Sequence, residues 1–353
     1  MNPASGEIRR VGGVPWWIVV GGLGALIAYP LAFTMPFHQH IVIMALLYGT
    51  LGTAWNILGG YTGQVSIGHG VYYGIGAYTA AYFYVNFGLS PWVSWPLALM
   101  IAFVAAFVIG LPTFRLRGHY FVLASVFIAE AAYIIISNWE MVGGAIGLEY
   151  PIHRAESPLD ALWHLQFHKS KLPYYYGILT LFVASIFVSW RIRFRPLGYF
   201  LKAVSEEQDA ARSLGVDIAR YKMVALLISV LFTTLCGIFY AQYVMYVEPV
   251  STMSLIISLE IAFIAIFGGI KTLWGPVLGA FIIIPVTELL RANFSGHIAL
   301  DQSALAEGGI GAWVDYYMAG GGGNVDLLVY GLLIIIIARF QPNGVIGFFH
   351  RFD

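Results

Sequence analysis

The stretch VSEEQDAARSLGVDIARYK, Val204 to Lys222, differs sharply from the rest of the chain. The protein is 59% hydrophobic and only 10% charged, yet charge is concentrated in the segment 191–222 around this stretch. Its charged residues are Arg191, Arg193, Arg195, Lys202, Glu206, Glu207, Asp209, Arg212, Asp217, Arg220 and Lys222. Because charges are costly inside a bilayer, we expect this segment to lie in water between apolar spans.

The composition on either side predicts an all-α polytopic membrane protein. Mean hydropathy is +0.78, outside the range of soluble domains, and apolar runs of about 18 residues or more can cross a bilayer as helices. Net charge is +0, which gives no indication of nucleic-acid binding. The single cysteine, Cys236, excludes a disulfide within the chain and a Cys-rich metal site. We interpret the N-terminal residues as a cytoplasmic tail and not as a signal peptide.

The apolar runs predict about ten transmembrane helices in one domain, residues 1–353. Their approximate ranges are 16–33, 41–58, 66–86, 92–112, 120–137, 174–190, 223–246, 255–269, 276–292 and 325–340. The third is rich in glycine and aromatic residues, so it is either a continuous or a broken helix. Glycine pairs after spans two and eight indicate either an internal duplication or ordinary helix ends.

The distribution of basic residues orients these spans. With both termini in the cytoplasm, only four of the 18 Lys and Arg residues lie outside. These are Arg154, Lys169, Lys171 and Arg291. Because cytoplasmic loops carry the excess of Lys and Arg, both termini and the loop 191–222 are predicted to be cytoplasmic, and the loops 138–173 and 293–324 extracytoplasmic.

Within the stretch Val204 to Lys222, the sequence predicts a short helix from Ser205 to Leu214, about 15 Å long. Ser205 is a favourable N-cap, Gln208 three residues later completes a capping box, and Gly215 is suited to the left-handed residue after the helix. Acidic residues open the helix and a basic residue lies near its end, as the helix dipole favours: Glu206, Glu207, Asp209 and Arg212. Its other side presents Ala210, Ala211 and Leu214. The helix is either a connector or a docking element for a groove on another protein.

Several strings resemble the branched-chain amino acid permease family of ABC transporters, specifically its LivM-like subunit. They are GGYTGQVSIGHGVYYGIGAYTAAY (59–82), LPTFRLRGHYFVLASVFIAE (111–130), GGAIGL (143–148), RPLGYFLKAVSEEQDAARSLGVDIARYK (195–222) and FGGIKTLWGPVLGAF (267–281). The resemblance covers about Gly49 to Arg291 and implies an ABC importer permease of the branched-chain amino acid/ribose type in a bacterial inner membrane. It departs from the family where Gln208-Asp209 precede Ala210, at the predicted docking helix.

The resemblance also implies partners. These are a second homologous permease subunit, two ATP-binding subunits and an extracytoplasmic solute-binding protein. Glu207 to Gly215 would then be the coupling helix, and Glu206 would lie beside it. GGIKT lacks the glycine that precedes lysine in a phosphate-binding loop, so ATP and Mg²⁺ are expected on partner chains, with no cofactor and no catalytic residue in this one.

Ionisable and polar residues in the spans are candidates for the translocation path, since such groups are often functional. The candidates are Gln64, Ser66, His69, Glu130 and Glu260. The alternative for His69 is a hydrogen bond that holds two helices together, and for either glutamate it is a structural carboxyl group. Gly70, Gly74 and Gly76, with Ala77 and Ala80, predict close helix packing.

Three other functions compete with branched-chain amino acid import. The same class of transporter could carry urea, a short amide or another amino acid. A proton-translocating subunit could use Glu130 and Glu260, but every lysine is expected in a loop, and such relays usually include buried lysines. An intramembrane enzyme is disfavoured because no HExxH motif or paired His/Asp metal spacing occurs in a predicted span, and no metal site is predicted.

Overall fold

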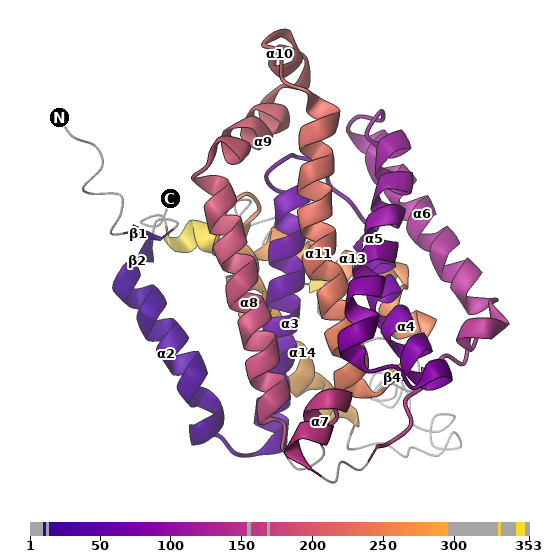
Figure 1. Ribbon diagram of the computed structural model, residues 1–353. Coiled ribbons are helices and arrows are strands. Elements are labelled where there is room, and N and C mark those ends of the chain that lie inside the picture. Colours follow the sequence, from indigo (N-terminus) through magenta and orange to yellow (C-terminus); the bar gives the residue numbers. More distant parts are fainter. Residues whose placement is uncertain are drawn as a thin grey trace, which may run out of the picture.

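The computed structural model describes residues 10–11, 14–153, 157–167, 170–295, 331–332 and 344–349. Long helices run side by side through this part of the chain (Figure 1). The helices are α2 (Trp16–Ala32), α3 (Pro36–Leu58), α4 (His69–Phe87), α5 (Pro91–Thr113), α6 (His119–Ser137), α7 (Pro158–His164), α8 (Leu172–Arg193), α9 (Pro196–Glu206), α10 (Gln208–Ser213), α11 (Ile218–Val244), α12 (Pro249–Thr252), α13 (Leu255–Gly269) and α14 (Gly275–Ser295), with the 3₁₀ turns η1 (Glu140–Val142) and η2 (Val345–Phe349).

Two short antiparallel ladders complete the described elements. One joins β1 (Arg10–Val11) to β2 (Val14–Pro15) near the start of the chain. The other pairs β3 (Leu148–Glu149) with β4 (Tyr246–Val247), so Leu148 lies opposite Val247 although the two are far apart in sequence. This second ladder fixes the segment after α6 to the end of α11.

Helix α3 forms the centre of the bundle. Within its most apolar window, 89% of the residues are buried, and it packs against α8, α11, α13 and α14. Leu51 and Trp55 are completely buried. A helix that is apolar on all sides is expected to be surrounded in this way.

Six described helices are long and apolar enough to cross a membrane, judged by length and composition. They correspond to the second, fourth, fifth, sixth, seventh and eighth predicted spans. The first and ninth coincide with the shorter apolar helices α2 and α14. The tenth, 325–340, lies outside the described residues except for 331–332, and so does most of the predicted loop 293–324. The fold is therefore a polytopic helical bundle, and the count of ten stays a prediction.

The third predicted span begins later than expected, because α4 starts at His69 and residues 59–68 are not helical. We call these ten residues the α3–α4 segment. Gly63 adopts a left-handed backbone there (φ 70°), which glycine accommodates without steric cost. Beyond the segment, the predicted close packing of α4 is confirmed: a Cβ atom at Gly76 would collide with the backbone of Thr234 in α11.

Helix α6 is buried along one narrow stripe. Phe121, Ser125 and Ala129 are its fully buried residues, spaced by one helical turn each. Tyr133 and Ile136 are partly buried, whereas other apolar side chains of α6 point outward; Phe127, for example, is 70% exposed. Such a surface suits contact with lipid or with another membrane subunit.

Candidate functional site

The charged segment 191–222 is built of helices and not of an extended loop. It contains the end of α8, all of α9 and α10, and the start of α11. Figure 1 shows α10 protruding beyond one end of the bundle, with α9 and α11 leading to and from it. We call this the α10 end; α7 lies at the opposite end.

The predicted helix from Ser205 to Leu214 is wrong at its start. Ser205 lies in the last turn of α9, and the chain breaks at Glu207, whose backbone is extended (φ −150°, ψ 108°). Helix α9 continues past Ser205 because Leu201 and Val204 are buried. Burying one such side chain stabilises by about 1.5–3 kcal/mol, whereas an N-cap contributes about 1 kcal/mol. Helix α10 therefore has 6 residues and is about 9 Å long.

The predicted helix end is confirmed. Gly215 is left-handed (φ 84°). Its N–H donates to the carbonyl of Arg212 at 2.9 Å, and the N–H of Val216 donates to that of Ala211 at 3.1 Å. These two bonds are the Schellman arrangement, which satisfies carbonyls that a helix end otherwise leaves unpaired.

The expected apolar face of this helix is divided between the inside and the outside of the molecule. Ala211 is only 3% exposed and packs against the rest of the chain, whereas Leu214 is 84% exposed. Ala210 is exposed as well. Of the three residues on the expected apolar face, only Ala210 and Leu214 are therefore available to another molecule, and Ala211 helps to hold α10 in place.

Two polar contacts anchor α10 to other helices. Arg117, in the turn between α5 and α6, donates to a carboxylate oxygen of Asp209 at 2.8 Å. This hydrogen bond and the positive charge of Arg117 hold the pKa of the Asp209 carboxyl below its usual value. The Nζ of Lys222 donates to the amide oxygen of Gln208 at 3.2 Å, so Gln208 faces α11 and does not form the predicted capping box.

The expectation that every lysine lies in a loop is wrong, because Lys222 belongs to α11 and is fully buried. It lies near the start of α11, next to α10. Sequence reasoning missed two contacts of α10, Gln208 with Lys222 and Asp209 with Arg117, because each forms only when separate elements pack together. The excess of charge between Val204 and Lys222 was the only feature of the sequence that pointed to these contacts.

The end of α9 lies against the α3–α4 segment. A Cβ atom on Gly63 would lie 3.3 Å from the Oγ of Ser205 and 3.5 Å from its Cα. The Ser205 hydroxyl is buried without a hydrogen-bond partner among the described residues, so this contact is one of packing. The junction of α9 and α10 is thereby joined directly to the segment that precedes α4.

Hydrogen bonds hold the α3–α4 segment and the first turn of α4 to α3, α6 and α13. The indole N–H of Trp55 in α3 donates to the carbonyl of Ser66 at 2.7 Å. The hydroxyl of Ser125 in α6 accepts from the N–H of Ile67 at 2.9 Å. At the first turn of α4, the N–H of Gly70 donates to the hydroxyl of Ser258 in α13, also at 2.9 Å. Irregular backbone inside a membrane bundle needs such partners.

His69 combines a structural bond with an unpaired ring nitrogen. It is fully buried, and its Nε2 lies 2.8 Å from the hydroxyl of Ser229. Ser229 donates its proton to the carbonyl of Ala54 at 2.6 Å, so Nε2 of His69 must be the donor to Ser229. The Nδ1 atom is then an acceptor, and it has no partner among the described residues.

The other path candidates differ in their surroundings. The buried Oε1 of Gln64 also has no partner among the described residues, and Ser66 is 6% exposed. Glu260 in α13 accepts from the hydroxyl of Tyr48 in α3 at 2.9 Å. Glu130 is half-buried on α6 and stands apart, with no hydrogen bond or ion pair to the part of the chain described. A cavity of about 20 Å³ beside Ser66 has room for about one water molecule.

Comparison with known proteins gives a family match. The family described as "Branched-chain amino acid transport system / permease component" matches residues 38–338. The high-affinity branched-chain amino acid transport system permease proteins LivM of Salmonella typhimurium and Escherichia coli are each 30% identical over 274 residues. These alignments cover 71% of this chain and 63% of each relative.

A more distant relative is similar as well. A probable branched-chain amino acid transport permease protein LivM of Methanocaldococcus jannaschii is 22% identical over 260 residues, which cover 71% of this chain and 67% of the relative. The chain thus matches less than two thirds of the length of the two bacterial relatives. No solved structure matches.

Proposed function

The chain belongs to the permease-component family of branched-chain amino acid transport systems, and on that premise we propose that it is a membrane subunit of an ATP-driven importer. Its cargo is a branched-chain or related amino acid. ATP and Mg²⁺ bind to partner chains, and this chain supplies the path and no catalytic residue. The observation that carries the proposal is the family match across residues 38–338, which includes both α10 and the α3–α4 segment.

We assign α10 as the coupling helix that docks on an ATP-binding subunit. It protrudes from the bundle (Figure 1) and exposes Ala210 and Leu214 at its tip. Arg212 lies on the exposed side too. Glu206 and Glu207 flank the helix start and are exposed. Because Glu206 lies 3.8 Å from Nζ of Lys202, Glu207 is the carboxylate that we assign to contact with a partner. Asp209 and Ala211 instead hold the helix to its own chain.

A movement imposed on α10 has two routes into the bundle. One runs through Gln208 to α11 and through Asp209 to the turn between α5 and α6. The other runs through Ser205 to Gly63 and so to the α3–α4 segment. Packed helices that rock between two arrangements are a general means of such transmission. Closure of the ATP-binding subunits would thus reach the polar residues of the segment.

The translocation path is proposed to pass the α3–α4 segment and the start of α4. Buried non-helical backbone and half-helix ends form substrate sites in other transporters because they offer free amides and carbonyls to charged groups. Gln64, Ser66 and His69 lie on this stretch, and Glu260 lies on the neighbouring α13. The segment is tightly packed in this conformation, so passage of an amino acid requires it to move. Glu130 is kept as a path residue because no group pairs with it among the described residues.

The assembly is proposed to contain a second homologous permease subunit, two ATP-binding subunits and a solute-binding protein. The outward apolar faces of α5 and α6 suit the second permease or the lipid bilayer. Large apolar side chains are also exposed between α6 and α8, such as Ile146 and Leu159, both 80% exposed. Exposed apolar patches often mark interaction sites, and this region suits the extracytoplasmic receptor.

We propose the remaining topology as the sequence predicts it, with about ten transmembrane helices in the inner membrane. The arrangement is that of an ABC importer permease of the branched-chain amino acid/ribose type. Both termini and α10 are cytoplasmic, and α7 is on the opposite side. This arrangement rests on the positive-inside rule. Cargo of a neighbouring class, such as urea or a short amide, is the outcome to separate by experiment.

The test is to purify the assembly from cells that make this chain and to measure ATP hydrolysis with its receptor and a panel of solutes. Leucine, isoleucine and valine should stimulate hydrolysis, and ATP-binding subunits should copurify in amounts equal to those of the permeases. Stimulation by urea or a short amide alone would replace the cargo and keep the class. Absence of any ATP-binding subunit from an intact, folded membrane complex would overturn the proposal.

A further inference from the structure

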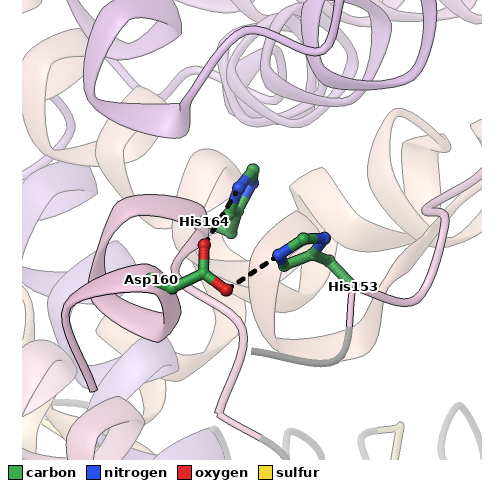
Figure 2. Close-up of side chains that lie close together, drawn as sticks. All are labelled: His153, Asp160 and His164. Atoms are coloured by element: carbon green, nitrogen blue, oxygen red, sulfur yellow. Dashed lines mark hydrogen bonds and ion pairs between the residues drawn. The ribbon is translucent and has the colours of Figure 1, made fainter. Parts of the chain in front are cut away.

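Three potential metal ligands lie close together in the chain segment that joins α6 to α8. The helix of this segment, α7, lies at the end of the bundle opposite α10 (Figure 1). The three ligands are His153, in the coil after β3, and Asp160 and His164 on α7. Figure 2 shows one carboxylate oxygen of Asp160 toward each histidine. Oδ2 of Asp160 lies 2.9 Å from Nε2 of His153, and Oδ1 of Asp160 lies 3.5 Å from Nε2 of His164. One ligand atom from each residue lies within 4.8 Å of the others.

The local sequence fixes two of these ligands on one helical face. Ser157 caps α7, accepting from the N–H of Asp160 at 3.2 Å, and Pro158 is at the first helical position, where proline is favoured. Asp160 and His164 are four residues apart, so they lie above one another on the helix. The helix is also fixed to α5, because the indole N–H of Trp92 donates to the carbonyl of Leu162 at 2.9 Å.

A buried second layer positions both histidines. Gln166 is 1% exposed; its amide oxygen accepts from the backbone N–H of His153 at 2.8 Å, and its NH₂ group donates to the hydroxyl of Tyr84 at 3.1 Å. That hydroxyl lies 3.2 Å from Nδ1 of His164. With a proton on Nδ1 donated to Tyr84, Nε2 of His164 is left as a bare ligand atom on the side of Asp160. Histidines that bind metals are commonly oriented in this way.

We propose that His153, Asp160 and His164 bind a divalent transition-metal cation, with Zn²⁺ as the representative ion. Zinc lies about 2.0–2.2 Å from nitrogen and carboxylate ligands in tetrahedral sites, which places ligand atoms about 3.3–3.6 Å apart. The separations of 2.9 Å between Nε2 of His153 and one oxygen of Asp160, and of 3.5 Å between Nε2 of His164 and the other oxygen, lie near that range. Two imidazoles and one carboxylate favour Zn²⁺, Co²⁺, Ni²⁺ or Cu²⁺ over Mg²⁺ and Ca²⁺, which prefer oxygen ligands.

The bound ion would tie the coil at His153 to α7 and, through Tyr84, to α4. The ligand side chains remain accessible, with exposures of 42% for His153, 29% for Asp160 and 21% for His164, so an ion can enter and a water can take the fourth position. The site contains no residue of α10 or of the α3–α4 segment. The proposed metal site therefore does not depend on the proposed transport function, and the two can be tested separately.

The experiment measures Zn²⁺ on the purified full chain, with any affinity tag removed, by elemental analysis after desalting and by titration against a competing chelator. The wild type should retain about one Zn²⁺ per chain. His153→Ala, Asp160→Asn and His164→Ala should each weaken binding at least tenfold. His119→Ala removes an exposed histidine outside the cluster and should bind as the wild type does. Tyr84→Phe should weaken binding about 10–100-fold, as loss of an outer-shell partner does.

A second readout separates loss of metal from loss of fold. Zn²⁺ should raise the unfolding temperature of the wild type and of His119→Ala but not that of His153→Ala, which alters a coil and leaves the cap of α7 intact. In chelator, His119→Ala should unfold at the wild-type temperature and His153→Ala slightly below it, because His153→Ala loses its hydrogen bond to Asp160. Binding by the wild type no stronger than by His153→Ala would overturn the metal site and leave a hydrogen-bonded His–Asp–His group only.

Discussion

Replacing Gly63 with alanine tests the contact that joins α9 to the α3–α4 segment. Gly63 has φ 70°, and a left-handed backbone costs an alanine about 1–2 kcal/mol. Its new Cβ would lie 3.3 Å from the Ser205 Oγ, which is too close for ordinary packing. Turning Ser205 away from its rotamer adds about 1 kcal/mol. Gly63→Ala should therefore destabilise the chain by about 2–3 kcal/mol and disturb the junction of α9 and α10.

Gly88→Ala is the matched control. Gly88 also has a left-handed backbone (φ 62°), but a Cβ there would meet nothing within 4 Å. Gly88→Ala should therefore lower the free energy of unfolding only by the backbone contribution of about 1–2 kcal/mol. Ser205→Ala removes a hydroxyl that has no hydrogen-bond partner among the described residues, so it should be nearly neutral alone and should restore part of the loss when combined with Gly63→Ala.

The assay is thermal unfolding of each variant together with uptake per ATP hydrolysed in proteoliposomes that hold the assembly. Gly63→Ala should lower uptake per ATP several-fold, Gly88→Ala should keep it at the wild-type value, and the double variant should recover. Equal uptake per ATP in Gly63→Ala and Gly88→Ala would refute the proposed route through Ser205.

Four further predictions concern single sites. Leu214→Asp should leave the unfolding temperature unchanged, because Leu214 is 84% exposed, and should lower ATP-driven uptake at least tenfold. Normal uptake by Leu214→Asp would contradict the docking role of α10. The hydrogen bond from Arg117 lowers the pKa of Asp209 in the folded protein. The small stabilisation from this pair should be complete above the ordinary aspartate pKa of about 4 and should be lost as the pH falls through the lowered pKa of the folded protein. Asp209→Asn should remove this pH dependence of stability from the unfolding curves, and an unchanged pH dependence would exclude the pair as its cause. Glu130→Gln should reduce uptake several-fold with normal assembly, whereas Glu140→Gln, exposed in η1, should not; wild-type uptake by Glu130→Gln would make Glu130 a structural carboxyl. A reporter fused after residue 160 should be extracytoplasmic, and a cytoplasmic signal would overturn the orientation.

The apolar runs were sufficient to locate the long helices, because a helix that crosses a membrane is apolar over about 20 residues whether its side chains are buried in the bundle or exposed on its surface. Gly215 and the close-packing glycines of α4 were also predictable, since few other residues fit a left-handed turn or a backbone contact. Ser205 misled for a physical reason: its local capping preference is weaker than the burial of Leu201 and Val204 in the preceding helix.

The polar contacts could not be predicted, because each depends on tertiary structure. Arg117 and Asp209 meet from opposite ends of a 92-residue interval. Lys222 meets Gln208 because α10 folds back toward α11. In the same way, the spacing of Asp160 and His164 on α7 is visible in the sequence, but the approach of His153 depends on Gln166 and on the β3–β4 ladder.

The central claim is that this chain is the path of an ATP-driven amino acid importer whose α10 faces the ATP-binding subunits. The most direct measurement is accumulation of labelled leucine by proteoliposomes that hold the complete assembly, with its receptor on the α7 side and nucleotide on the α10 side. Accumulation against the gradient should require hydrolysable ATP and should cease with a non-hydrolysable analogue. Leucine accumulation driven by a pH gradient without ATP, or independent of the receptor, would contradict the account.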